Sequence, residues 1–251
     1  MSTWATRRKL LYASFAMLLL IGAIVPLVWR TYPAPSCSDG KQNQGEQGID
    51  CGGPCTRICS ATTEPLRVLW MRPFTVSPGV ASAAALVLNP NAKVGADSVA
   101  YRLRLYDDQN ILIAERQGKT IVPANSQFPI FEGGIPVGNR SPSRAFLEFM
   151  EEPNWRLWGE APALTLKNQQ FMQSPSSLEA DVVNPAVDTV RNVRAYAVIF
   201  DVGGNAIGAS KTLIDRIPGG GATHAVFTWL TPFASSSAVS ERIYLLAPRI
   251  P

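Results

Sequence analysis

The sequence predicts an all-β protein in which two tandem antiparallel β-sandwiches follow one N-terminal transmembrane helix and a small disulfide-bonded loop. Three observations predict this arrangement: an uncharged apolar run at residues 10–29, four cysteines confined to one short stretch, and an internal repeat that relates residues 66–158 to residues 162–251. Residues 1–9 are then a cytoplasmic tail, and residues 30–65 are a linker that contains the cysteines.

Residues 10–29 read LLYASFAMLLLIGAIVPLVW, a run of 20 residues without a charged side chain. At 1.5 Å per residue this helix spans about 30 Å, the thickness of the hydrocarbon core of a bilayer. Arg7, Arg8 and Lys9 precede the run, whereas only Arg30 follows it closely, so the positive-inside rule places the N-terminus in the cytoplasm. We therefore expect a single-pass membrane protein with its C-terminal domains on the extracytoplasmic side.

A cleaved secretory signal is the main alternative to this signal-anchor. Cleaved signals have a shorter apolar core, about 7–15 residues, followed by a small-residue cleavage site. The core here is longer and no such site follows it. A twin-arginine signal, suggested by TRRKLLY, fits so apolar a core poorly. We therefore favour an uncleaved anchor.

Composition and charge limit the classes of partner. An apolar fraction of 46% with 17% charged residues argues against a disordered chain. The net charge of +4 comes from the first 30 residues, which hold four basic residues and no acid, leaving 19 basic and 19 acidic residues after them. Since no basic block with interleaved aromatic residues follows, we expect no nucleic-acid partner. No small-molecule substrate is evident either.

The cysteine-rich module, residues 37–59, holds every cysteine of the chain: Cys37, Cys51, Cys55 and Cys59. The spacing C-x13-C-x3-C-x3-C lacks the paired C-x2-C elements of structural zinc sites, and the one histidine is distant. On the oxidising side of a membrane, four cysteines indicate two disulfides, with three connectivities open. Cross-links or a metal are needed because so short a module cannot bury a sufficient core.

Four oxygen-bearing side chains lie between the cysteines, at intervals of four, three and four residues: Asp39, Asn43, Glu46 and Asp50. Together with the surrounding glycines they are candidate calcium ligands, although the spacing is not that of an EF-hand. The alternative is that they are solvated turn residues. The stretch resembles a short cysteine-rich acidic loop of bacterial surface and exported proteins, which implies calcium-type ligation. No other cofactor is expected.

The repeat is clearest in two pairs of segments. SVAYRLRLYD at residues 98–107 aligns with NVRAYAVIFD at 192–201, and LVLNPN at 86–91 aligns with DVVNPA at 181–186. In the first copy apolar residues alternate with small or basic ones, as in a strand with one face on a second sheet. The alternating apolar positions are Val99, Tyr101, Leu103 and Leu105 in copy one, and Val193, Ala195, Ala197 and Ile199 in copy two.

LRLYD, residues 103–107, resembles the signature of the FxLYD domain, a bacterial immunoglobulin-like β-sandwich, and an Asn-Pro turn precedes it as in that family. Leu103 stands where the family has phenylalanine, and AVIFD in the second copy keeps only the aspartate and an aromatic residue before it. The resemblance implies two tandem immunoglobulin-like domains in an exported, membrane-associated bacterial protein with no known chemistry.

Catalytic sets are not indicated. His224 follows PGGGAT and is expected on the surface, and Glu148, Glu151 and Glu152 are expected to be solvated. Trp155 and Trp158 lie near the boundary of the two copies, where large amphipathic rings either fill the contact between domains or bind a partner.

Three functional hypotheses remain. The favoured one is a non-enzymatic protein of the bacterial cell envelope, anchored in the cytoplasmic membrane, whose sandwiches act as an interaction or spacer module for a protein partner. The second is a subunit of an envelope assembly such as a secretion, pilus or division complex. The third is an enzyme.

Overall fold

The structure is a computed structural model that describes residues 4–31, 35–233 and 240–249. The chain divides into two compact units, Met1–Cys55 and Thr56–Pro251. The parts of the predicted tail, linker and second sandwich at residues 1–3, 32–34, 234–239 and 250–251 lie outside the described residues. Each unit is described separately below.

The first unit begins with helix α1, Trp4–Thr31, which contains Pro26. Within it, Thr6–Leu27 forms a stretch of 22 residues with a mean hydropathy of 2.3, and none of it is buried against protein. By length and composition this helix can cross a membrane, as the uncharged run predicted; a signal sequence has the same properties. So many exposed leucine side chains need an apolar cover, which a bilayer supplies.

The second unit is built from antiparallel strands after a short 3-10 helix, η1 (Ser60–Thr62). The first six strands are β1 (Arg67–Ser77), β2 (Val80–Asn89), β3 (Val94–Tyr106), β4 (Leu112–Val122), β5 (Ser126–Pro136) and β6 (Arg144–Phe149). They form two sheets, β1-β2-β5 and β4-β3-β6. The short strand β7 (Arg156–Leu157) pairs with β3.

The next six strands repeat this order. They are β8 (Thr165–Gln173), β9 (Ser176–Val183), β10 (Val190–Phe200), β11 (Ala206–Ile217), β12 (Ala222–Thr228) and β13 (Ser240–Leu246). Their sheets are β8-β9-β12 and β11-β10-β13, the same two orders as in the first six strands. The internal repeat found in the sequence therefore corresponds to a repeated sheet topology.

Within each set of six strands the two sheets bury their apolar faces against each other. In the first set, Val87 and Phe128 of one sheet pack with Val99 and Tyr101 of the other. In the second set, a core of the same kind joins residues of β9 and β12 to residues of β10 and β11. Every predicted inward-facing residue of β3 and β10 is at most 5% exposed, so these inward positions are confirmed. The opposite face is partly exposed in β3 as predicted, but in β10 Tyr196 and Val198 are buried as well, so the predicted solvent-facing side of this strand is wrong.

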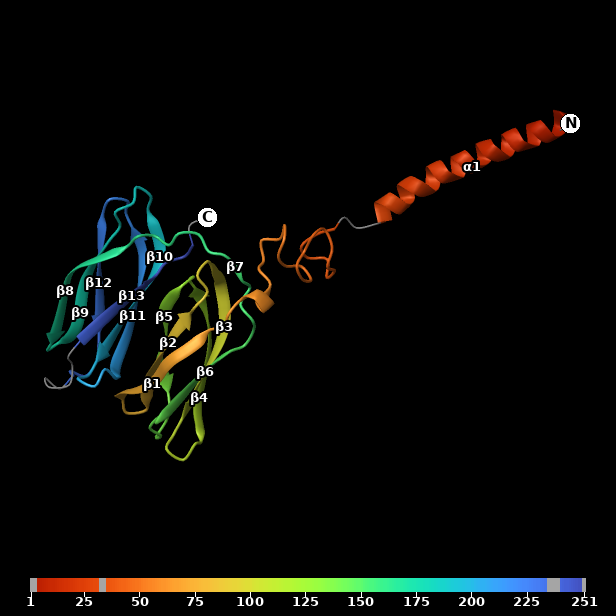
Figure 1. The fold of residues 1–251 in the computed structure, drawn as a ribbon. Coiled ribbons are helices and arrows are strands. Elements are labelled where there is room, and N and C mark those ends of the chain that lie inside the picture. Colours follow the sequence, from red (N-terminus) through yellow and green to blue (C-terminus); the bar gives the residue numbers. More distant parts are fainter. Residues whose placement is uncertain (1–3, 32–34, 234–239, 250–251) are drawn as a thin grey trace. The chain divides into compact units, whose positions relative to one another are not determined.

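The sheets β1-β2-β5 and β11-β10-β13 also pack on each other through their outer faces. Ala84 is buried with Val198 and Ala209, and the ring of Trp70 stands edge-on to that of Phe200, with centroids 6.3 Å apart. Strand β2 is thus covered on both faces, which explains its run of small apolar residues. The unit has four layers, with β4-β3-β6 and β12-β9-β8 outermost (Figure 1).

The two Asn-Pro turns have equivalent roles in the two sets. Asn89 is fully buried, and its Nδ2 donates to the carbonyl oxygens of Val94 (2.9 Å) and Pro123 (2.8 Å). Asn184 likewise donates to the carbonyl oxygens of Asp188 (2.8 Å) and Ile217 (3.3 Å). Each carboxamide therefore ties the end of a strand to two further loops or strands.

The aspartates that end LRLYD and AVIFD are equivalent too. A carboxylate oxygen of Asp107 accepts from the backbone N–H of Ile111 at 2.8 Å, and one of Asp201 accepts from that of Asn205 at 2.8 Å. Both side chains thus close the hairpin turn after the central strand. This contact explains the aspartate of the motif by turn geometry.

Candidate functional sites

All four cysteines of the module are in disulfides. Cys37 and Cys55 are joined with a Cα–Cα distance of 5.6 Å, Cys51 and Cys59 are disulfide-bonded as well, and no cysteine is free. This confirms the predicted disulfides. A thiolate zinc site of the kind considered from the sequence would need these sulfurs reduced, because only the thiolate form is a metal ligand.

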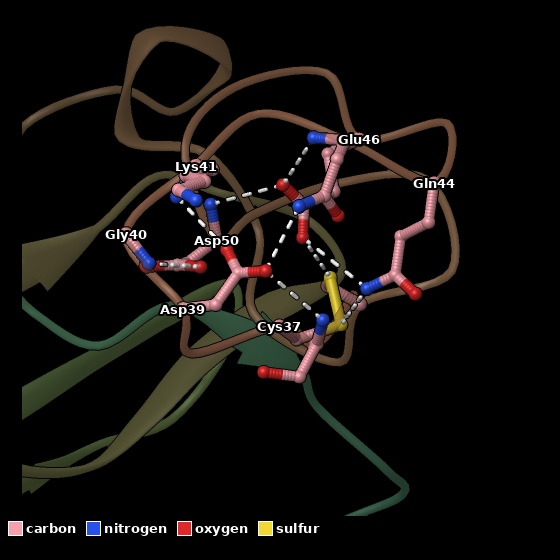
Figure 2. Close-up of a disulfide and its surroundings, with 10 residues drawn as sticks. Cys37, Asp39, Gly40, Lys41, Gln44, Glu46 and Asp50 are labelled. Atoms are coloured by element: carbon pink, nitrogen blue, oxygen red, sulfur yellow. Dashed lines mark hydrogen bonds between the residues drawn. A yellow bond between two sulfur atoms is a disulfide. The ribbon is translucent and has the colours of Figure 1, made fainter. Parts of the chain in front are cut away.

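Glu46 is the buried acid of the module, with 7% of its surface exposed. Its Oε2 accepts from the backbone N–H groups of Asn43 (3.2 Å) and Asp50 (3.3 Å), as Figure 2 shows. Its Oε1 lies 3.1 Å from Sγ of Cys55 and 3.5 Å from Nε2 of Gln44. Because a disulfide sulfur carries no hydrogen, amide groups hold this carboxylate in place.

The carboxylates of Asp39 and Asp50, two more of the predicted calcium ligands, also accept hydrogen bonds from the loop itself. Oδ2 of Asp39 accepts from Nδ2 of Asn43 at 2.8 Å, which lowers the pKa of Asp39, and Oδ1 accepts from the backbone N–H of Lys41 at 2.9 Å. Both carboxylate oxygens of Asp50 accept from the backbone N–H of Gly40, at 3.1 and 3.0 Å (Figure 2). These contacts favour the turn interpretation.

The acidic side chains do not converge on one point. In the described part of the chain, the group of acidic and sulfur side chains whose ligand atoms lie within 4.8 Å of one another is Glu46 with the disulfide-bonded Cys37 and Cys55. Oδ1 of Asn43 is buried without a hydrogen-bond partner, which leaves one acceptor free. Calcium binding by Asp39, Asn43, Glu46 and Asp50 therefore stays a prediction.

The two predicted tryptophans have different surroundings. Trp155 is 3% exposed and belongs to the core of the first set of sheets. Trp158 is partly buried over Gly95, where a Cβ atom would lie 2.4 Å from the indole ring. Trp158 lines one cavity and Trp155 lines another, so a binding role stays a prediction for both residues.

The cavity at Trp158 has a volume of about 390 Å³ and lies where three segments of the unit meet: the start of β5, residues 158–164, and the segment from β13 to residue 249. Phe128, Trp158 and Tyr244 supply its aromatic walls. The hydroxyl group of Tyr244 is buried and has no hydrogen-bond partner. The cavity cannot be recognised in the sequence, because its walls come from segments far apart in the chain.

His224 lies on the outer face of β12-β9-β8 and is exposed as predicted, but the sequence did not reveal its partners. Its Nδ1 is 2.9 Å from Oδ1 of Asp181, and its Nε2 is 3.2 Å from Oε2 of Glu179. The contact with Asp181, supported by Glu179, raises the pKa of His224. Asn168 and His224 together lower the pKa of Asp181.

Replacing His224 with glutamine is expected to remove a stabilisation that depends on pH. Because the pKa of His224 is raised in the folded state, its contacts give their full stabilisation below the unfolded-state pKa near 6.5. This stabilisation is lost as the pH rises through the folded-state pKa. The lowered pKa of Asp181 acts in the opposite direction: its contribution is present above about 3.9 and is lost as pH falls through the folded value. Melting temperatures of wild type and His224→Gln should differ most between about pH 4 and 6.5. A difference that grows toward pH 8 would contradict this.

The outer face of β4-β3-β6 carries a network of charged residues. Nε of Arg104 is 3.0 Å from Oε2 of Glu115, and its Nη1 is 3.3 Å from Oε2 of Glu148. Arg102 contacts the same two carboxylates, at 3.3 and 3.9 Å. Glu148, expected to be solvated, is thus an ion-pair partner, and all four side chains remain partly exposed.

No family model matches the chain, and no curated protein matches it. Among solved structures, red sea bream transglutaminase is similar at 8% sequence identity and a TM-score of 0.21, with 72% of this chain and 31% of that chain covered. This chain therefore spans about a third of the length of that structure. A similarity this low supports no argument about fold or activity, and the FxLYD resemblance stays a prediction.

Proposed function

We propose that the chain is a non-enzymatic, membrane-anchored protein of the bacterial cell envelope whose sheet unit acts as an interaction or spacer module outside the cytoplasmic membrane. One observation carries this proposal: a 22-residue apolar stretch, unburied by protein, precedes a segment whose four cysteines are all in disulfides. Disulfides persist in oxidising compartments, so the sequence after the helix belongs on the outer side. The basic residues before the helix favour the same orientation.

The repeated topology supports assigning both sets of six strands as tandem immunoglobulin-like sandwiches. Two antiparallel sheets packed face to face, with the same strand orders in both copies, are what that architecture requires. The contact through Ala84, Val198 and Ala209 joins the copies into one compact unit. A unit of this kind suits a spacer or a binding platform, since packed sheets hold their outer faces in fixed relation.

Membrane fractionation tests the proposal. Full-length chain expressed in a bacterial host should sediment with membranes and resist alkaline carbonate extraction. Replacing both Leu19 and Leu20 with arginine should release it, because each charge at the centre of a helix costs about 2.5–3.5 kcal/mol of insertion free energy. Leu230→Arg, at a position 78% exposed in the sheet unit, is the matched control and should remain in the membrane. Extraction of the wild-type chain by carbonate would contradict the proposal.

A further inference from the structure

The repeated topology allows the two copies to be compared position by position. Asp107 and Asp201 close equivalent turns, which makes Arg104 the counterpart of Val198 and Tyr106 the counterpart of Phe200. The strand pairing agrees with this alignment. Arg104 is opposite Glu115, and Val198 is opposite Ala209, which is the counterpart of Glu115 in the second copy.

The other sheet is aligned by the Asn-Pro turns. Since Asn89 and Asn184 are equivalent, Glu179 of β9 is the counterpart of Ala84 of β2, and Asp181 is the counterpart of Leu86. Trp70 is paired with Leu86 and Lys167 is paired with Asp181, so Lys167 is the counterpart of Trp70.

These counterparts fall on the contact between the two copies. Inside the chain, the outer face of β1-β2-β5 docks on the outer face of β11-β10-β13, with Ala84 against Val198 and Trp70 against Phe200. The counterparts of these two faces lie on the outermost layers of the unit. The outer face of β12-β9-β8 corresponds to that of β1-β2-β5, and the outer face of β4-β3-β6 corresponds to that of β11-β10-β13. A contact between two different faces is heterologous, and its repetition between molecules gives an open-ended row.

We propose that copies of this chain associate head to tail, with the outer face of β12-β9-β8 of one copy docked on the outer face of β4-β3-β6 of the next. The docking geometry is that of the contact within the chain. In this contact Glu179 takes the place of Ala84, and Arg104 of the next copy takes the place of Val198. The pair Trp70–Phe200 is replaced by Lys167 against Tyr106, a cation–π contact.

Charge complementarity supports this partner. The central strand β3 presents Arg102 and Arg104 on one free face, beside the carboxylates of the neighbouring strands, and the central strand β9 presents Glu179 and Asp181 on the other, beside His224. All four side chains are 28–32% exposed, so they are available to a second molecule. Contacts between partly exposed charges are individually weak and are screened by salt. The association is therefore reversible and salt-sensitive, and it does not depend on the membrane anchor.

Charge reversal tests the proposal on the full-length chain in detergent, with mass measured by sedimentation. At low salt the average mass of the wild-type chain should rise with concentration to at least about twice that of the monomer, and it should return to the monomer near 1 M salt, where the Debye length is about 3 Å. Glu179→Arg and Arg104→Glu should each remain monomeric, since each variant sets two like charges against each other where Glu179 would meet Arg104.

An equimolar mixture of these two variants should associate again, because each variant carries the charge that the altered face of the other needs. Asp188→Arg, which makes the same charge change in the exposed loop between β9 and β10, should associate like wild type. A mixture that stays monomeric, a wild-type chain that is monomeric at low salt, or single variants that associate like wild type would overturn the proposal.

A milder pair of variants covers the case in which a reversed charge impairs folding. Glu179→Gln and Arg104→Gln remove one charge each without introducing repulsion, and cooperative thermal melting checks that they fold. Each should weaken association about several-fold at low salt. Their mixture should recover pairs, because the unchanged Glu179 face of one variant can dock on the unchanged Arg104 face of the other. Unchanged association in both variants would overturn the proposal.

Discussion

Replacing Asn89 with leucine is expected to lower the free energy of unfolding of the sheet unit by about 3 kcal/mol. The side chain is fully buried, and its Nδ2 is a donor to the carbonyl oxygens of Val94 and Pro123. Leucine fills a similar volume but donates nothing, and each buried carbonyl left without a partner costs about 1–3 kcal/mol. Urea unfolding followed by tryptophan fluorescence measures the change, with the largely buried Trp155 among the reporters.

The repeat provides a second test of the same contact and a control. Asn184→Leu should cost a comparable free energy, because Asn184 is 1% exposed and donates to two carbonyl oxygens in the same way. Asn139→Leu, in the exposed loop between β5 and β6, should change stability by no more than about 0.5 kcal/mol. Equal effects at Asn89 and Asn139 would show that the buried carboxamide does not tie these loops together.

Removing the Cys37–Cys55 disulfide, with both cysteines replaced by serine, is expected to open the acidic loop. The bond closes 18 residues of sequence, and its loss should cost about 3 kcal/mol of loop stability by chain entropy. A loop with so few buried apolar residues has little else to oppose that cost. The backbone amides of Asn43 and Asp50, which donate to Glu46, should then exchange with solvent much faster.

Hydrogen exchange of these two amides, compared between wild type and the Cys37→Ser/Cys55→Ser variant, measures this effect. Unfolding of the sheet unit in urea serves as the internal control and should be unchanged. Amides of Asn43 and Asp50 that stay protected in the variant would mean that the carboxylate contacts of Glu46, rather than the disulfide, maintain the loop.

Strand identity and inward-facing residues could be predicted from the sequence because they depend on local alternation. The residues of β10 from Ala195 to Ile199 are buried on both faces, and an uninterrupted apolar run of this kind indicates a strand covered on both sides. The hydrophobic pattern of β10 does not show which strand covers its second face. It depends on a contact with β2, more than 100 residues earlier in the chain.

Register and loop contacts were harder to predict. In the sequence repeat, Phe74 aligns with Phe171. In the structure the counterpart of Phe74 is Met172, because Phe74 pairs with Ser82 and Met172 pairs with the equivalent serine, Ser177. A bulge between Lys167 and Gln170 causes this shift of one residue. In the acidic loop, residue types suggested calcium ligands. Whether their oxygens face a cation or backbone N–H groups depends on turns such as that at Gly40, whose φ is +72°.

The most direct test of the account is the side of the membrane on which the sheet unit lies. A recognition sequence for a site-specific protease would be inserted after Val187, a residue 95% exposed in the loop between β9 and β10, and a second chain would carry it ahead of Met1. Protease added to intact bacterial spheroplasts should cut the first chain without detergent and the second only after lysis. Cleavage after Val187 only upon lysis would place the sheets in the cytoplasm and contradict the account.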